Sequence, residues 1–389
     1  MGSSTPVTTD PEPTELVGTL FLEDGTRFDG QGTGAPASAT GEVVFTTGMA
    51  GYPESLTDPS YRGQILVFTY PLLGNYGVPS TTARDGDGLP TFVESDHIQV
   101  RGMVARGLTT SSHWGQAQTL PGWLRSEGVP GITGIDTRRL TQHLRSQGVL
   151  RGVIDVSPFG HAPSNEELVR RLRSAPLYGD EPLVAEVAVS EPAVYRRARG
   201  PWVAVIDCGV KASILRALLA RGLTVVRLPP DTAVPERWDG HRVAGVVVGN
   251  GPGDPAALET TIEGLARLPR RGIPTLGVCL GHQLLALAHG GTTFKLKYGH
   301  RGQNKTVTFP DGRALIVSEN HGFAVDATSL DGTPLKPWAI NPDDGTLEGL
   351  RDSSGSILAL QGHPEGHPGP QEAGFVFDLF ADRVRQRAR

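Results

Sequence analysis

The chain has little cysteine, no long hydrophobic run and no excess of either charge. Its 389 residues include only two cysteines, Cys208 and Cys279, too few for a disulfide scaffold and in keeping with a reducing compartment. No apolar run approaches the roughly 18 residues that span a bilayer, and the N-terminus lacks the basic start and apolar centre of a secretion signal. We therefore expect a cytoplasmic protein that has no contact with a membrane.

Basic stripes and nucleotide-binding loops are also missing. The net charge is -5, and Lys and Arg are scattered along the chain, which argues against nucleic acid as a partner. No Gly-x-x-x-x-Gly-Lys-Ser/Thr sequence occurs, so we expect no ATP site in this chain. Small molecules and other proteins are the expected partners.

Composition divides the chain into four segments. Residues 1–16, rich in Ser, Thr and Pro, are expected to form a disordered tail. Residues 17–180 carry short apolar runs broken by Gly and Pro, followed by stretches of helical spacing, which predicts a β-rich α+β domain. The segment 181–200 is punctuated by proline and is expected to be a linker to a second domain at 201–389.

The second domain alternates strand and helix patterns. Four apolar runs predict strands: 202–206, 224–228, 243–248 and 273–278. Helical patterns lie between them, and this alternation indicates right-handed βαβ units around a mostly parallel sheet flanked by helices. In such α/β folds ligands lie at the carboxyl ends of the strands, where Gly251, Cys279 and His363 are found.

Cys279 has the sequence surroundings of a catalytic thiol. It stands on the turn between a predicted buried strand and a predicted helix, where Gly277 and Gly281 permit a strained backbone and close approach of a substrate. The N-terminus of a helix favours thiolate over thiol, so we expect Cys279 to be reactive.

A base and a group that orients it follow in His363-Pro364-Glu365. Pro364 disfavours helix, and in an extended chain residues two apart point the same way, so both side chains can line one wall. A cysteine nucleophile needs such a pair. The glycines of Asn250-Gly251-Pro252-Gly253 expose backbone N–H groups, and the amides of Gly251 and Leu280 are the candidates for an oxyanion hole.

Structural readings compete with these catalytic ones. A lone cysteine after an apolar strand is more often a small buried hydrophobe, and we expect this of Cys208, which has no histidine partner in the sequence. His363 and His367 are four apart, but Pro364 and Gly366 disfavour the helical face of a zinc pair. We therefore predict no metal. Lys295, Lys297 and Arg301 are expected to be a solvated face or a protein contact.

Three spaced motifs in residues 201–389 resemble the class I, triad-type glutamine amidotransferases. They are Asn-Gly-Pro-Gly-Asp-Pro from Asn250, Gly-Val-Cys-Leu-Gly-His-Gln from Gly277 and Gly-His-Pro-Glu from Gly362. Asn320-His321-Gly322-Phe323 and several N-terminal motifs, including Leu56-Thr57-Asp58-Pro59-Ser60-Tyr61, are similar to the small subunits of carbamoyl-phosphate synthetase. The resemblance covers nearly the whole chain.

This resemblance implies a role for each matching residue. Cys279 would form a glutamyl thioester, His363 would act as acid and base, and Glu365 would orient His363. The residues implied in binding L-glutamine are Ser60, Gly251, Gly253, Leu280, Gln283, Asn320, Gly322 and Phe323. The neutral polar side chains of Ser60 and Gln283 suit the charged ends of an amino acid.

The resemblance further implies a heterodimer with a large subunit, docked through the N-terminal domain. This chain would need no cofactor, while the large subunit would use ATP, magnesium and bicarbonate to make carbamoyl phosphate for pyrimidine or arginine synthesis. Two alternatives stay open: a paralogous glutaminase that feeds ammonia to a different ligase in specialised metabolism, and a catalytically silent scaffold. The intact Cys279, His363 and Glu365 argue against the scaffold.

Overall fold

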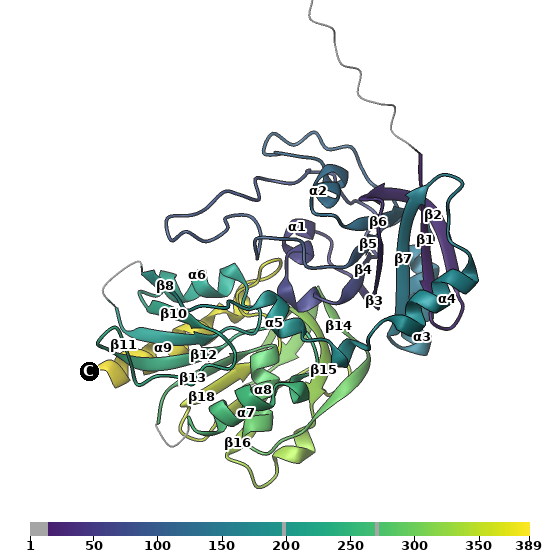
Figure 1. The fold of residues 1–389 in the computed structure, drawn as a ribbon. Helices are drawn as coiled ribbons and strands as arrows, with labels where there is room; N and C mark the ends of the chain where they lie inside the picture. The colour runs from purple at the N-terminus through teal and green to yellow at the C-terminus, as the bar shows by residue number, and fades with distance from the viewer. Residues whose placement is uncertain (1–14, 197–199, 269–271) are drawn as a thin grey trace, which may run out of the picture.

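A computed structural model describes residues 15–389 except 197–199 and 269–271. Two bodies are seen, an N-terminal barrel and a larger C-terminal sheet covered by helices on both faces (Figure 1). The expected tail at 1–16 lies almost wholly outside the described residues, and the first strand already begins at Leu16.

The N-terminal domain is built on a closed seven-stranded barrel with the order β1-β2-β6-β5-β4-β3-β7. Its strands are β1 (Leu16–Leu22), β2 (Arg27–Gly34), β3 (Ser38–Thr46), β4 (Gln64–Phe68), β5 (Gly102–Val104), β6 (Pro130–Thr133) and β7 (Leu150–Pro158). Its helices are α1 (Tyr52–Leu56), α2 (Leu120–Ser126), α3 (Thr137–Gln147) and α4 (Asn165–Ser174). Closure leaves no free sheet edge, and apolar side chains such as Leu20, Ile65 and Ile154 fill the interior.

Local sequence explains where the helices of this domain begin. Thr119, Asp136 and Ser164 precede α2, α3 and α4, and each side chain accepts a hydrogen bond from a backbone N–H of the first turn. Gly148 ends α3 with a φ of 101°, in the left-handed region that glycine favours.

The C-terminal domain is a mixed sheet whose centre is parallel. The strands are β8 (Ala193–Arg196), β9 (Trp202–Ile206), β10 (Thr224–Leu228), β11 (Arg237–Trp238), β12 (His241–Val248), β13 (Thr275–Val278), β14 (Thr293–Thr308), β15 (Ala314–Val325), β16 (Leu335–Ile340), β17 (Leu347–Asp352) and β18 (Ile357–Leu360). The helices are α5 (Leu183–Val187), α6 (Ala212–Ala220), α7 (Glu259–Ala266), α8 (Leu280–Ala288) and α9 (Phe375–Ala388). Within the order β10-β9-β12-β13-β18 every neighbouring pair is parallel, which confirms the expected α/β architecture.

Helices cover both faces of this parallel centre. Side chains of α6 and α9 pack into one apolar core and those of α7 and α8 into another on the opposite face. The chain order reverses between β9 and β12, because β10 lies on one side of β9 and all later strands lie on the other. Ligands bind at the carboxyl ends of strands beside such a switch point.

Two parts of the sheet differ from the sequence-based prediction. The segment 181–200 is more than a linker, because it forms α5 and the strand β8, which pairs antiparallel with β10 and extends the sheet. Beyond β18 the sheet continues through the antiparallel strands β17, β16, β14 and β15. The long β14–β15 hairpin reaches the N-terminal domain, since Thr47 Oγ1 donates to the carbonyl oxygen of Arg301 on β14 at 3.4 Å.

Candidate active site

Cys279 occupies a strained turn between β13 and α8. Its φ of 53° and ψ of -105° make it one of two non-glycine residues with positive φ in the described part of the chain. A Cβ atom at Gly281 would lie 2.1 Å from the carbonyl oxygen of Val248, and one at Gly277 would lie 2.7 Å from that of Gly281. Both glycines are therefore required for the helix to approach the sheet this closely. The thiol stands at the N-terminus of a nine-residue helix.

His363 and Glu365 lie behind this turn, where they are fixed by the neighbouring strands. The Nδ1 atom of His363 is 2.7 Å from Glu365 Oε1, and both side chains are buried. The backbone N–H of His363 donates to the carbonyl oxygen of Ser318 on β15 at 2.8 Å. Among the described residues the Nε2 atom of His363 has no hydrogen-bond partner, so it is available to the thiol of Cys279 or to a substrate.

The charges around His363 favour its protonated form. Burial is the largest single influence and lowers the pKa of His363, as does the Lys211 charge, but the Glu365 carboxylate together with the charge and hydrogen bond of Cys279 raises this pKa to about 10. Burial in turn raises the pKa of Glu365, but Lys211 and His363 hold that pKa well below its usual range. The arrangement stabilises an imidazolium beside an ionised carboxylate, as a thiolate nucleophile requires.

Lys211 is a site residue that sequence reasoning missed. Its Nζ atom donates to Glu365 Oε1 at 2.8 Å and also to the carbonyl oxygen of His367. Lys211 follows β9 and is 154 residues from Glu365 in sequence, so only the fold brings the two residues together. Its position directly after a buried strand of the same sheet was the available signal.

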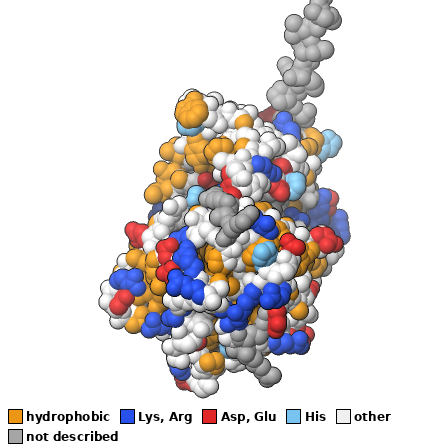
Figure 2. Space-filling view, turned by 90° about the vertical axis from the view of Figure 1, so that its left-hand side faces the viewer, with side chains coloured by type: hydrophobic (Ala, Val, Ile, Leu, Met, Phe, Trp, Pro, Cys, Tyr) orange, Lys and Arg blue, Asp and Glu red, His pale blue; other side chains and the backbone are white. Residues whose placement is uncertain are grey.

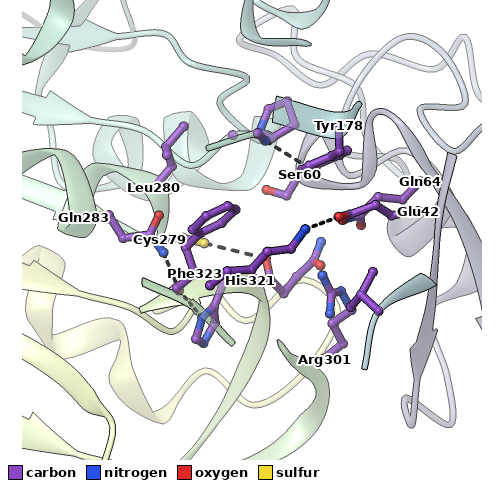
Figure 3. A pocket seen from close by; sticks show the side chains of 17 residues that line it. Glu42, Ser60, Gln64, Tyr178, Cys279, Leu280, Gln283, Arg301, His321 and Phe323 are labelled. Carbon is purple, nitrogen blue, oxygen red and sulfur yellow. Dashed lines mark hydrogen bonds and ion pairs between the residues drawn. The ribbon is translucent and has the colours of Figure 1, made fainter. Parts of the chain in front are cut away.

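The pocket in front of Cys279 contains every residue that the resemblance implies in binding. Its wall includes Ser60, Gly251, Gly253, Leu280, Gln283, Asn320, Gly322 and Phe323. Figure 3 shows the sulfur of Cys279 near the middle, with Leu280 and Gln283 on one side and Glu42 and Arg301 on the other. The empty space, with solvent at the mouth included, is about 440 Å³.

Ser60 is carried into the pocket by the N-terminal domain. Asn250, at the end of β12, donates to Ser60 Oγ at 2.9 Å, and Asp58 accepts the backbone N–H of Ser60 at 2.9 Å. Asp58 also accepts a hydrogen bond from Asn320 Nδ2 at 3.1 Å. Because Ser60 Oγ accepts from Asn250, its own hydrogen is free to be donated to a ligand.

Gln283 is oriented by its neighbours. Its Nε2 atom donates to the carbonyl oxygen of Phe323 at 2.7 Å and to Gln361 Oε1 at 3.0 Å. Both amide hydrogens are thus used, and the carbonyl oxygen of the side chain is the group left for a ligand. Gln361 also donates to the sulfur of Cys279 at 3.6 Å, so it links this amide to Cys279.

The backbone N–H groups of Gly251 and Leu280 are suitable oxyanion donors. In the described part of the chain neither N–H donates a hydrogen bond. A Cβ atom at Gly251 would lie only 2.0 Å from the carbonyl oxygen of Cys208, so glycine is required at this place. Both residues line the pocket beside Cys279.

The basic residues near the pocket are less solvated than the sequence suggested. Arg301 is 4 % exposed and donates to the carbonyl oxygen of Tyr298 at 2.8 Å. Lys295 forms an ion pair with buried Glu42 of the N-terminal barrel. The prediction that Arg301 lies on a solvated face is therefore wrong. Lys295 makes a contact between the two domains.

The second cysteine has the packing role expected of it. Cys208 is fully buried in the core on the α7 and α8 face of the sheet. Burial raises the pKa of its thiol, which keeps it protonated and unreactive.

Among the described helices none has the length and apolarity to cross a bilayer.

Comparisons with known proteins agree with this architecture. The family model of the carbamoyl-phosphate synthase small chain, CPSase domain, matches residues 20–154, and that of class-I glutamine amidotransferase matches 204–383. The carbamoyl phosphate synthase small chain of Methanopyrus kandleri is 46% identical over 370 residues, which cover 94% of this chain and 99% of that protein. The small chain of Pyrococcus furiosus is 44% identical over 372 residues, which cover 95% and 98% of the two chains.

A fungal relative extends the comparison. The carbamoyl phosphate synthase arginine-specific small chain of Chaetomium globosum is 43% identical over 375 residues, which cover 94% of this chain and 78% of that protein. Together the two family models and these identities show that the chain belongs to the carbamoyl phosphate synthase small chain family and carries a class-I glutamine amidotransferase domain.

Proposed function

We propose that this chain hydrolyses L-glutamine through Cys279, His363 and Glu365 and passes the ammonia to an ATP-dependent large subunit that makes carbamoyl phosphate. The observation that carries the proposal is the position of Cys279. It stands at a positive φ on the N-terminus of α8, in front of the buried His363–Glu365 pair and within a pocket lined by both domains.

The first half of the reaction forms a thioester and releases ammonia. The Cys279 thiolate attacks the side-chain amide carbon of glutamine, and the negative charge moves onto the amide oxygen, where the N–H groups of Gly251 and Leu280 stabilise it. Removing one such donor typically costs about 3–4 kcal/mol of transition-state stabilisation. Protonated His363 then gives its proton to the leaving nitrogen, the C–N bond breaks and the glutamyl thioester remains.

The second half consumes water. Neutral His363 takes a proton from a water molecule, which attacks the thioester, and the C–S bond breaks to give glutamate and restore the thiolate beside the imidazolium. Glu365 stays ionised throughout, because Lys211 and His363 hold its pKa low against the effect of burial. Its part is to hold His363 in the reactive orientation.

Recognition of glutamine combines the two domains. The free hydroxyl hydrogen of Ser60 suits the α-carboxylate, and the side-chain oxygen of Gln283 suits the α-ammonium group. The backbone around Asn320, Gly322 and Phe323 provides further polar contacts along the substrate.

The N-terminal domain is the proposed docking surface for the large subunit. Its exposed large hydrophobic side chains include Met49, Leu72, Phe92 and Trp114, and Trp114 is 93 % exposed. Figure 2 shows hydrophobic side chains gathered at the upper left of the face it presents, whereas blue and red side chains lie to the right of them and below. Exposed apolar groups of this kind mark protein contacts. Ammonia in neutral water is mostly protonated and not nucleophilic. We therefore expect it to pass directly from this chain to the large subunit.

Glutamate release by the purified chain, measured with and without a large subunit, tests the proposal. We expect hydrolysis that is stimulated by the large subunit and carbamoyl phosphate formation that depends on both chains and ATP. Cys279→Ser should abolish both, while Cys208→Ala should change neither, since the buried Cys208 thiol stays protonated and unreactive. Equal glutamate release by wild type and Cys279→Ser would refute the triad. Glutaminase activity without carbamoyl phosphate formation would instead favour a different ligase as the partner.

A further inference from the structure

Four buried side chains beside the pocket form a cluster to which the proposed reaction gives no role. They are His300 on β14, Glu319 and His321 on β15, and Glu348 on β17. One ligand atom from each lies within 4.8 Å of those from the other three. Their side chains are 8%, 0%, 2% and 0% exposed, respectively. His321 also lines the wall of the glutamine pocket.

The hydrogen bonds of the two histidines aim their remaining nitrogen atoms at the carboxylates. His321 Nδ1 lies 2.8 Å from the carbonyl oxygen of Phe323, which can only accept, so Nδ1 carries the proton. The Nε2 lone pair of a neutral His321 then faces Glu319 Oε2 at 3.3 Å. His300 Nε2 lies 2.8 Å from Asp344 Oδ2, which leaves Nδ1 facing Glu319 Oε2 at 3.1 Å.

A cation between these groups would offset the repulsion between facing hydrogen-bond acceptors and between buried negative charges. Two acceptors face each other at His321 and Glu319, and two carboxylates lie in a region from which water is largely excluded. Among the described residues, His300 Nδ1, Glu319 Oε1 and Glu348 Oε2 are buried atoms without a hydrogen-bond partner. Two neutral imidazoles and two carboxylates carry a charge of -2, which one divalent ion neutralises.

Three of the six ligand–ligand distances are close to those around a tetrahedral ion, and all six are within 4.8 Å. Bonds of about 2.0–2.1 Å place the ligands of a tetrahedral zinc ion about 3.3 Å apart. Three of the separations are 3.1 Å for His300 Nδ1 to Glu319 Oε2, 3.3 Å for His321 Nε2 to Glu319 Oε2 and 3.7 Å for His300 Nδ1 to Glu348 Oε1. Metal-bound histidines almost always donate their second N–H to a carboxylate or a backbone carbonyl, as His300 does to Asp344 and His321 to Phe323.

We propose that His300, Glu319, His321 and Glu348 bind one divalent first-row transition ion, with Zn²⁺ the best match to two nitrogen and two oxygen ligands. Calcium and magnesium prefer all-oxygen ligand sets. Asp344, which lies 2.8 Å from His300 Nε2, is 41% exposed. The ion would tie β14, β15 and β17 together beside Asn320, so its role would be to hold that wall of the pocket rather than to react with glutamine.

Metal binding is measured directly on the full chain. Tag-free protein is stripped with a chelator, dialysed against Zn²⁺ or Co²⁺ and analysed for metal content, visible absorption and melting temperature. We expect one Zn²⁺ per chain, the intense visible bands of tetrahedral Co²⁺, and a rise of a few degrees in melting temperature with saturating Zn²⁺. No stoichiometric uptake by the wild type would overturn the proposal, because the cluster would then be a protonated hydrogen-bonded group.

Two variants and one control test whether the bound ion lies at these four residues. Glu348→Gln and Glu319→Gln should each weaken Zn²⁺ binding at least 100-fold. His97→Asn should leave it unchanged, since His97 also faces a carboxylate, that of Glu127 at 3.2 Å, but is 77% exposed. Equal uptake by the wild type and both Gln variants would refute the assignment. If a variant fails to fold, the Co²⁺ spectrum of the wild type still decides, because an octahedral spectrum would contradict this ligand set.

Discussion

The ion pair of Lys211 and Glu365, behind the proposed triad, offers a direct test of how the site is stabilised. Lys211 Nζ and Glu365 Oε1 are 2.8 Å apart, and their side chains are 2% and 1% exposed. Lys211→Met keeps most of the volume but leaves the Glu365 carboxylate with His363 alone. Removing one partner of a buried pair costs about 3–5 kcal/mol, because an uncompensated charge remains in a region of low polarity. We expect a loss of unfolding free energy of that size, together with a rise in the pKa of Glu365 and a fall in glutaminase activity.

The midpoint of urea unfolding at neutral pH measures this loss of unfolding free energy. The double variant Lys211→Met with Glu365→Gln should be more stable than Lys211→Met, because the stranded charge is gone, but should be no more active than Lys211→Met. Arg62→Met is the matched control. The Nε atom of Arg62 lies 2.6 Å from Glu186 Oε2, but the two side chains are 34% and 31% exposed. Exposed pairs of this kind contribute at most about 1 kcal/mol. Equal losses in Lys211→Met and Arg62→Met, or a double variant no more stable than Lys211→Met, would show that the reasoning is wrong.

Three further predictions concern the turn, the base and the pocket. Gly281→Ala should cost more than about 3 kcal/mol in urea unfolding and abolish activity, because its Cβ would lie 2.1 Å from a backbone oxygen, while Gly264→Ala in α7, with open space around it, should be neutral or stabilising. The pKa of His363 is raised from 6.5 to about 10. Its contribution to the free energy of unfolding is therefore complete below pH 6.5 and is lost as the pH rises toward 10. Unfolding measured across this window should show a loss of at most about 5 kcal/mol in wild type and a flatter profile in His363→Gln. Ser60→Ala should raise the KM for glutamine about tenfold through one lost hydrogen bond, with no such rise in Ser80→Ala, because Ser80 is partly exposed and lies outside the pocket.

The local parts of the fold were predictable because they depend on short-range chemistry. The helix beginning at Thr137 follows an Asp136 that caps it, and the turn at Cys279 is marked by glycines on both sides. Buried apolar runs such as Trp202–Ile206 predicted the parallel strands, since strands covered on both faces are apolar throughout. These signals were enough to place Cys279 and His363 at strand ends and to predict the α/β architecture.

The parts that were missed depend on contacts between distant residues. The strands of the β14–β15 hairpin carry charged residues whose burial is decided by the barrel opposite, so Arg301 could not be recognised as buried from its neighbours in sequence. The strand β8 has an alternating pattern of partly buried and exposed residues, and it is fixed by pairing with β10 rather than by its own apolarity. Asn250 and Ser60 are 190 residues apart, and no local pattern specifies that they meet.

The proposed glutamine pocket is lined by residues of both domains, and this would tie hydrolysis to the position of the N-terminal barrel. Ser60 reaches the pocket from the barrel and is held by Asn250 of the second domain, while Asp58 from the same turn holds Asn320. These hydrogen bonds are 2.9 Å and 3.1 Å long, so a shift of the barrel by about 1 Å breaks both, because such bonds weaken steeply beyond 3.5 Å. A partner that binds the barrel therefore acts on the same contacts that position the substrate, and the stimulation of glutamate release by a large subunit should be lost when Ser60 no longer contacts Asn250.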